Sequence, residues 1–104
     1  MKKILLMILA SLMASQSYAV DCGPVEIKAI QSQKEDVLVL IKGNGLEAWK
    51  SLGLHSQQST SSFQSIAQQA LATRVSVILR FPDGENCGET DYSTSAQAIR
   101  IYGY

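Results

Sequence analysis

Two cysteines constrain this chain more than any other feature, because they stand near opposite ends of it. Cys22 follows an apolar leader, and Cys87 lies in the acidic segment FPDGENCGETDY, residues 81–92. In an oxidising compartment two cysteines make one internal bridge, and closing most of a small chain contributes ~4 kcal/mol in the chain-entropy description. We therefore expect Cys22 and Cys87 to pair. A free reactive thiol and a bridge between two chains are the alternatives.

The first nineteen residues have the three parts of a secretory signal peptide. Residues 1–3 are a basic start, residues 4–14 are an apolar run, and small residues precede a cut before Val20. The run is shorter than the ~20 apolar residues that span a bilayer. The expectation is Sec-type export to the periplasm or the outside of a bacterium, with 1–19 as the signal peptide and 20–104 as one disulfide-linked domain. An uncleaved anchor is the alternative.

The exported part carries too little positive charge for a nucleic-acid binder. Lys2 and Lys3 belong to the leader, so what remains of the nine basic residues is outnumbered by the nine acidic ones. Binding to nucleic acid rests on neutralising phosphates, so we expect no nucleic-acid partner. No later apolar run is long enough to cross a membrane. A domain of this size buries a limited share of its surface and often depends on a disulfide.

Hydrophobic periodicity predicts five strands and one helix. Strands are indicated by apolar residues that alternate with polar ones and by one β-branched run with two apolar faces. The expected strands are residues 24–33, 36–43, 46–52, 74–84 and 96–104. A helix is expected after the third strand, with Ser61 and Gln64 as its capping box and Phe63, Ile66 and Leu71 on its apolar face.

A tight hairpin joins the second and third expected strands. Residues 44–45 are Asn-Gly, which favours a type I′ turn because both residues tolerate a positive φ. In that register Lys42 faces Glu47 and Leu40 faces Trp49.

The resulting order is β-β-β-α-β-β. A mainly β chain with one helix between the third and fourth of five strands has the order of a small OB-fold-like Greek-key barrel. An open α+β sheet with one helix lying across it is the alternative.

The chain also resembles the B subunits of pentameric bacterial toxins of the cholera, pertussis and subtilase cytotoxin types. The matching features are a cysteine at the start of the exported chain (Cys22), the helix segment SSFQSIAQQA, the strand that follows at residues 75–77, and a late cysteine (Cys87). The resemblance implies an OB-fold, assembly of several copies, and binding of sugars at a cell surface. It assigns no glycan-binding residue to a position in this chain.

The residues with chemical potential do not form a recognised catalytic or metal site. The segment between the fourth and fifth expected strands is expected to be a solvated loop. Its acids align poorly with a calcium loop, because Thr94 stands where a bidentate glutamate is required. One histidine and two pairing cysteines are too few ligands for zinc. His55, the single histidine, lies in a Ser/Gln-rich loop without a nearby acid. We therefore expect no enzyme, metal or cofactor; a hydrolase would have to gather His55 with a serine and an acid from elsewhere.

The remaining candidates are aromatic residues and one acid next to Cys87. Exposed aromatic faces stack on sugars, and their polar tips form hydrogen bonds at interfaces. The candidate binding residues are Tyr92, Asp91, Trp49 and Tyr102. The alternative is that Trp49 and the tyrosines fill the core. The leading hypothesis is an exported, non-enzymatic binding module for a glycan or a protein; the second is a small periplasmic structural or inhibitory protein that binds one envelope protein.

Overall fold

The computed structural model describes residues 18–102, so all of the expected signal peptide except Tyr18 and Ala19 lies outside the described residues. The described part contains six strands and one helix. In chain order they are β1 (Val20–Ser32), β2 (Asp36–Gly43), β3 (Leu46–Leu54), α2 (Ser59–Thr73), β4 (Val77–Phe81), β5 (Asp91–Ser95) and β6 (Ala98–Ile101). β1 begins at Val20, the residue that follows the expected cut.

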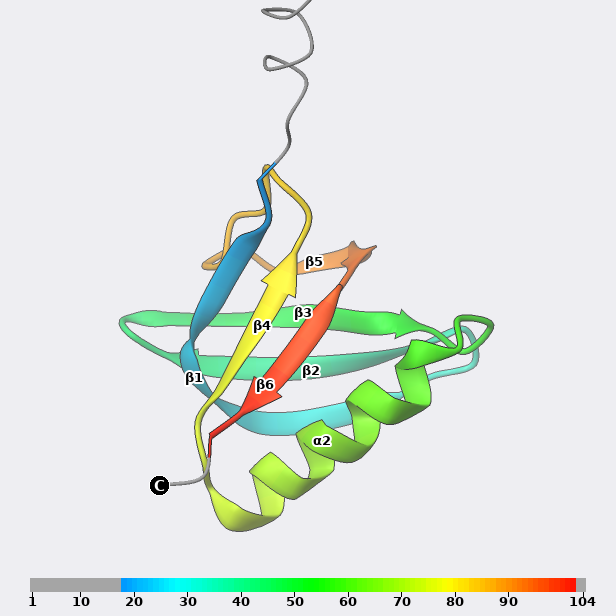
Figure 1. Cartoon of the computed structure of the whole chain (residues 1–104), viewed down its shortest axis with the longest axis horizontal. Helices are drawn as coiled ribbons and strands as arrows, with labels where there is room; N and C mark the ends of the chain where they lie inside the picture. The colour runs from blue at the N-terminus through cyan, green and yellow to red at the C-terminus, as the bar shows by residue number, and fades with distance from the viewer. Residues whose placement is uncertain (1–17, 103–104) are drawn as a thin grey trace, which may run out of the picture.

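The six strands form one mixed sheet that curls into a half-barrel, with the order β5-β3-β2-β1-β4-β6. The long β1 pairs with β2 through one half and with β4 through the other, and β5 lies parallel to β3. Figure 1 shows β1 crossing from one half of the sheet to the other. The expectation of a mainly β fold with one helix is confirmed, and the curled sheet is compatible with a small OB-fold-like barrel. The single helix also matches the alternative, an α+β sheet.

The two residues between β5 and β6 connect opposite sides of the curl. The amide of Ala96 donates to the carbonyl of Ser51 in β3 at 2.9 Å, and the amide of Gln97 donates to the carbonyl of Arg80 in β4 at 2.7 Å. One continuous segment thus bonds first to β3 and then to β4. The sequence predicts five strands where six are found because β5 lies in the segment between the last two expected strands, which is predicted to be a loop.

A bend in β1 allows this strand to serve both halves of the sheet. The pairing of β1 with β4 shifts register between Cys22 and Val25. Gly23 lies in this bend at φ +146°, and a Cβ there would come within 2.7 Å of the Val77 carbonyl oxygen. Glycine is therefore required at this position by the close approach of β4.

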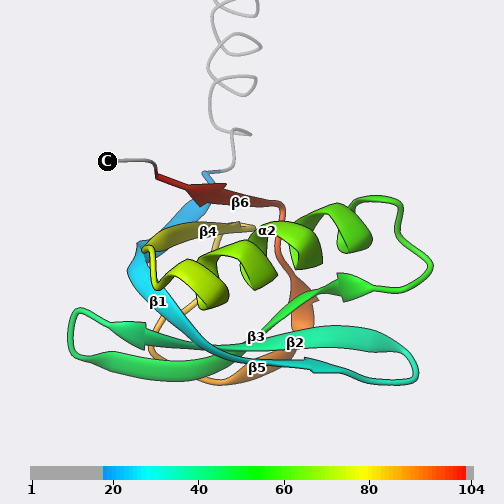
Figure 2. The same cartoon turned by 90° about the horizontal axis from the view of Figure 1, so that it is seen from below.

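The core fills the inside of the curl and extends to α2, which covers one end of the barrel (Figures 1 and 2). Inward positions alternate along the strands, as a sheet with one buried face demands. Val37, Val39 and Ile41 of β2 are fully buried, and Ala67 and Ala70 of α2 allow the helix to pack closely. Phe63 and Ile66 pack against the same cluster, as the helical periodicity predicts. Leu71, expected on the same face, is 38% exposed, so that part of the prediction is wrong.

The start of the helix differs from the sequence prediction. α2 begins at Ser59 after Gln58, which makes no side-chain capping bond, so the predicted capping box at Ser61 is wrong. The reason is Thr60, whose hydroxyl donates to the carbonyl of Leu54 at 2.6 Å and is buried. This contact starts the helix directly beside the end of β3, one turn earlier than the capping pattern indicates.

The hairpin prediction is confirmed in detail. Asn44 and Gly45 have φ values of +53° and +78°, the signs that a type I′ turn requires. Lys42 pairs with Glu47, and Leu40 pairs with Trp49.

Candidate functional site

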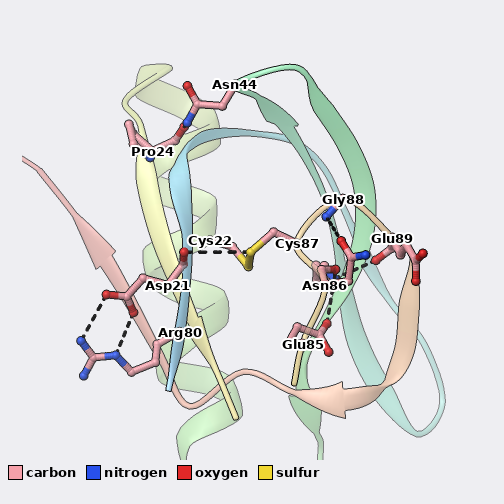
Figure 3. The surroundings of a disulfide bond; sticks show 11 residues. Asp21, Cys22, Pro24, Asn44, Arg80, Glu85, Asn86, Cys87, Gly88 and Glu89 are labelled. Atoms are coloured by element: carbon pink, nitrogen blue, oxygen red, sulfur yellow. Dashed lines mark hydrogen bonds and ion pairs between the residues drawn. A yellow bond between two sulfur atoms is a disulfide. The ribbon is translucent and has the colours of Figure 1, made fainter. Parts of the chain in front are cut away.

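The loop between β4 and β5 is bonded covalently to the first strand. Cys22 and Cys87 form a disulfide, with an S–S distance of 2.04 Å and a Cα–Cα distance of 5.4 Å, so the predicted pairing is confirmed. Figure 3 shows the bridge reaching from β1 to the loop, close to Asp21 and Asn86. A disulfide of this kind indicates an oxidising compartment.

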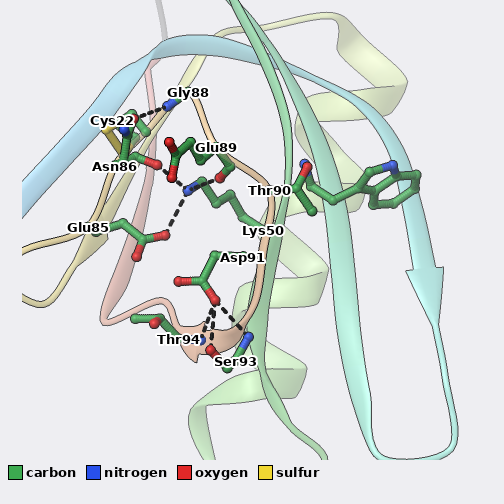
Figure 4. A network of polar contacts seen from close by, with 12 residues as sticks. Cys22, Lys50, Glu85, Asn86, Gly88, Glu89, Thr90, Asp91, Ser93 and Thr94 are labelled. Atoms are coloured by element: carbon green, nitrogen blue, oxygen red, sulfur yellow. Dashed lines mark hydrogen bonds and ion pairs between the residues drawn. A yellow bond between two sulfur atoms is a disulfide. The ribbon is translucent and has the colours of Figure 1, made fainter.

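A fully buried lysine binds the same loop from inside the barrel. The Lys50 side chain is 0% exposed, and its Nζ donates to Glu85 Oε2, the Asn86 carbonyl and the Glu89 carbonyl, each at 2.7 Å. Figure 4 shows these three contacts converging on one nitrogen. The ammonium also lies 5.5 Å from the centre of the Phe81 ring. All three donors of the ammonium are used, and the loop is bonded on both sides of Cys87.

Strand alternation places Lys50 in this position. Ala48, Lys50 and Leu52 are the inward residues of β3, and all are buried. Lys50 is not among the predicted site residues, although a lysine at an inward strand position between two apolar residues indicates a buried charge. A buried charge requires a partner, and the nearby acids were interpreted as solvated. Glu85 is not: its side chain is 5% exposed and bonded to Lys50.

Asp91 organises the chain where the loop becomes β5. One carboxylate oxygen accepts hydrogen bonds from the Ser93 amide and hydroxyl, both at 2.8 Å, and from the Thr94 amide at 3.2 Å. These bonds hold the pKa of Asp91 far below its ordinary value, and the bond from the Ser93 backbone amide has the largest effect. The carboxylate is therefore already engaged within its own turn.

This arrangement predicts how stability depends on pH. A carboxyl group whose pKa is lower in the folded than in the unfolded protein stabilises the fold at pH values above its ordinary pKa of 3.8. This contribution is lost as the pH falls below that value. The urea concentration at the midpoint of unfolding should fall less steeply in Asp91→Asn than in the wild type between about pH 5 and about pH 2.5. Asp83→Asn, which removes an exposed acid of the same loop, is the control. A curve for Asp91→Asn as steep as that of the wild type would contradict this role.

Three of the four predicted binding residues come together beside this loop. The Trp49 amide donates to Thr90 Oγ1 at 3.1 Å, and the next residue, Lys50, pairs with Asp91. Trp49 is partly exposed and lies outside the core cluster, and Tyr92 is 57% exposed. We call Trp49, Thr90 and Tyr92 the β3–β5 seam. Tyr102 is not part of it, because it follows β6, whose last pair is formed with Val77 at the far end of β4.

The acids of the loop do not gather around a metal position. A hollow of about 200 Å³ is lined by Glu85, Glu89 and Asp91 with neighbouring loop residues. No group of three or more His, Cys, Asp or Glu side chains suited to hold a metal ion occurs within residues 18–102. His55 is exposed, and its Nε2 lies 2.6 Å from the Gln33 carbonyl oxygen.

Comparison with known protein families, with curated proteins and with solved structures finds no match to this chain. In the described part of the chain, no helix has both the length and the apolar character needed to cross a bilayer.

Proposed function

We propose that the chain is an exported, non-enzymatic binding module that takes a glycan at the β3–β5 seam. The observation that carries the proposal is the combination of an exposed aromatic side chain, Tyr92, with a neighbouring loop that is fixed by a disulfide and by Lys50. A surface that is ordered before binding loses less conformational entropy when the ligand arrives. The disulfide and the signal-peptide pattern both support export.

The position of the seam in the fold supports this choice. OB-folds bind oligonucleotides and oligosaccharides on the face of their second and third strands, next to the loop between the fourth and fifth. The seam lies at the edge of β3, and the fixed loop is the one between β4 and β5. Because phosphate would meet Glu89, Asp83 and other acids of this loop, an uncharged sugar fits better than a nucleic acid. Tyrosine and tryptophan offer flat faces and polar tips to such a ligand.

The resemblance to toxin B subunits adds sugar binding and assembly of several copies to the same proposal. The second hypothesis, a one-to-one complex with an envelope protein, differs from it in stoichiometry. Native mass spectrometry of the purified protein distinguishes the two, because a homomeric ring gives multiples of one mass and a complex with a partner gives the sum of two.

The proposal predicts a specific loss of glycan binding. In a glycan-array screen the wild-type protein should bind at least one sugar, and Tyr92→Ala should weaken that interaction by about tenfold or more, as expected for a central aromatic contact. Leu71→Ala is the matched control, since Leu71 is also an exposed apolar residue, at 38%, but lies on α2. Unchanged affinity in Tyr92→Ala, with the fold intact by circular dichroism, would place the site elsewhere.

A further inference from the structure

The strand β6 has one side that no other strand of the described sheet pairs with. The sheet order ends at β6, and its pairs, from Val77–Ile101 to Arg80–Ala98, are all with β4. Ala96 and Gln97, which bond to Ser51 and Arg80, precede β6 and are not part of it. A strand at the end of a sheet presents backbone N–H and C=O groups that an extended peptide can pair with.

An apolar hollow lies along this strand. It has a volume of about 320 Å³ and is lined by isoleucines from three elements together with Ala98. The isoleucines are Ile66 of α2, Ile78 of β4, and Ile99 and Ile101 of β6. The hollow is separate from the β3–β5 seam, and the inference does not depend on the glycan proposal.

The rim of the hollow is positively charged. Arg80 is paired with Asp21, with 2.9 Å between Nε and Oδ1. Arg100, also on the rim and exposed, forms no ion pair within 4.0 Å with any carboxylate among residues 18–102. The rim therefore has two arginines for one aspartate. Arg100 acts on Asp21 only from a distance, without an ion-pair contact, so its guanidinium can still contact a partner's carboxylate.

This charge argues against a second copy of the chain that pairs with β6 through its own β6. Two copies that paired through β6 about a two-fold axis would bring the same patch to itself. Each would contribute Arg80 and Arg100 against one Asp21, and like charges across paired strands are destabilising. An acidic segment of a different protein would be attracted electrostatically to the same surface.

We propose that β6 receives an extended, acidic segment of a partner protein as an additional strand. Alternate side chains of such a strand point to opposite faces. Apolar side chains level with Ile99 and Ile101 enter the hollow toward Ile66, and acidic side chains level with Arg100 reach its guanidinium. The preferred segment alternates aliphatic and acidic residues.

Two capped peptides test this proposal on the oxidised, full-length exported protein labelled with ¹⁵N. One alternates glutamate with valine and the other alternates lysine with valine. The glutamate peptide should shift the amide signals of residues 98–101 and bind about tenfold more tightly than the lysine peptide. Arg100→Glu should reverse that preference, while Lys28→Glu, a charge reversal on an exposed residue of β1, should leave it unchanged.

The proposal would be overturned by equal binding of both peptides, by signal changes that map away from β6, or by no binding of either peptide at millimolar concentration. A concentration-dependent dimer in sedimentation that involves the amides of β6 would also overturn it, in favour of a second copy as the occupant.

Discussion

Lys50→Met should be the most destabilising single substitution of a charged residue in this protein. Methionine fills a similar volume, but it leaves the Glu85 carboxylate and the carbonyls of Asn86 and Glu89 without their common donor. Removing one partner of a buried ion pair costs about 3–5 kcal/mol. Because a whole domain is stable by only about 5–15 kcal/mol, the free energy of unfolding from urea titration should fall by a large fraction.

Lys42→Met is the matched control on the same hairpin. Its ammonium lies 3.9 Å from Glu47, and both side chains are more than half exposed. An exposed pair of this kind contributes about 0–1 kcal/mol. If Lys50→Met and Lys42→Met destabilise the protein equally, the account of the buried lysine is wrong.

The contribution of Glu85 can be separated with the double variant Lys50→Met, Glu85→Gln. Replacing the carboxylate with a neutral amide removes the unpaired buried charge, so the double variant should recover part of the lost stability. It should not recover all of it, because the Asn86 and Glu89 carbonyls still lack a donor, and each unsatisfied buried group costs about 1–3 kcal/mol. Full recovery would show that the two carbonyl contacts contribute nothing.

Removing the disulfide is the second large change. Replacing Cys22 and Cys87 with alanine should lower the free energy of unfolding by about 2–4 kcal/mol, since the bridge spans 65 positions of the chain. Alanine is preferred to serine because Cys22 is 1% exposed and a hydroxyl there would be buried. Reduction of the wild type with dithiothreitol should give a similar loss. A double-alanine variant as stable as the oxidised protein would show that the bridge does not support the fold.

The disulfide and Lys50 hold the same loop, so their effects should be coupled. Once Lys50→Met has loosened the loop, loss of the bridge removes interactions that are already weakened. The combined loss in stability should therefore differ from the sum of the two separate losses. Simple additivity would mean that the two attachments act on independent parts of the structure.

The sequence predicts most of the fold of this molecule because most of its elements follow from short-range sequence patterns. The register of the β2–β3 hairpin follows from Asn44 and Gly45, and the apolar face of α2 from Phe63 and Ile66. The disulfide follows from counting cysteines in a chain that is expected to be exported. The start of α2 is different, because Thr60 bonds to a residue of another element, Leu54, and no local capping pattern contains that information.

The candidate site was less predictable, because it also depends on contacts between residues that are far apart in the sequence. Trp49 is distant in sequence from Asp91 and Tyr92, and it comes close to them only because β5 lies parallel to β3. A parallel pair has no hairpin that reveals its register, so the sequence predicts a loop where β5 forms. The sequence predicts that the acids of this loop are solvated. The structure shows instead that Glu85 is bonded to Lys50 from inside the barrel.

The order of the loop in the free protein is the most direct test of the account, because a loop ordered before binding is what qualifies the seam as a site. ¹⁵N relaxation of residues 84–91 in the oxidised protein measures this motion on the picosecond-to-nanosecond timescale. We predict order parameters close to those of β3, about 0.85, as in rigid backbone. Values below about 0.6, typical of flexible segments, would contradict the claim that the disulfide and Lys50 hold this surface ready for a ligand.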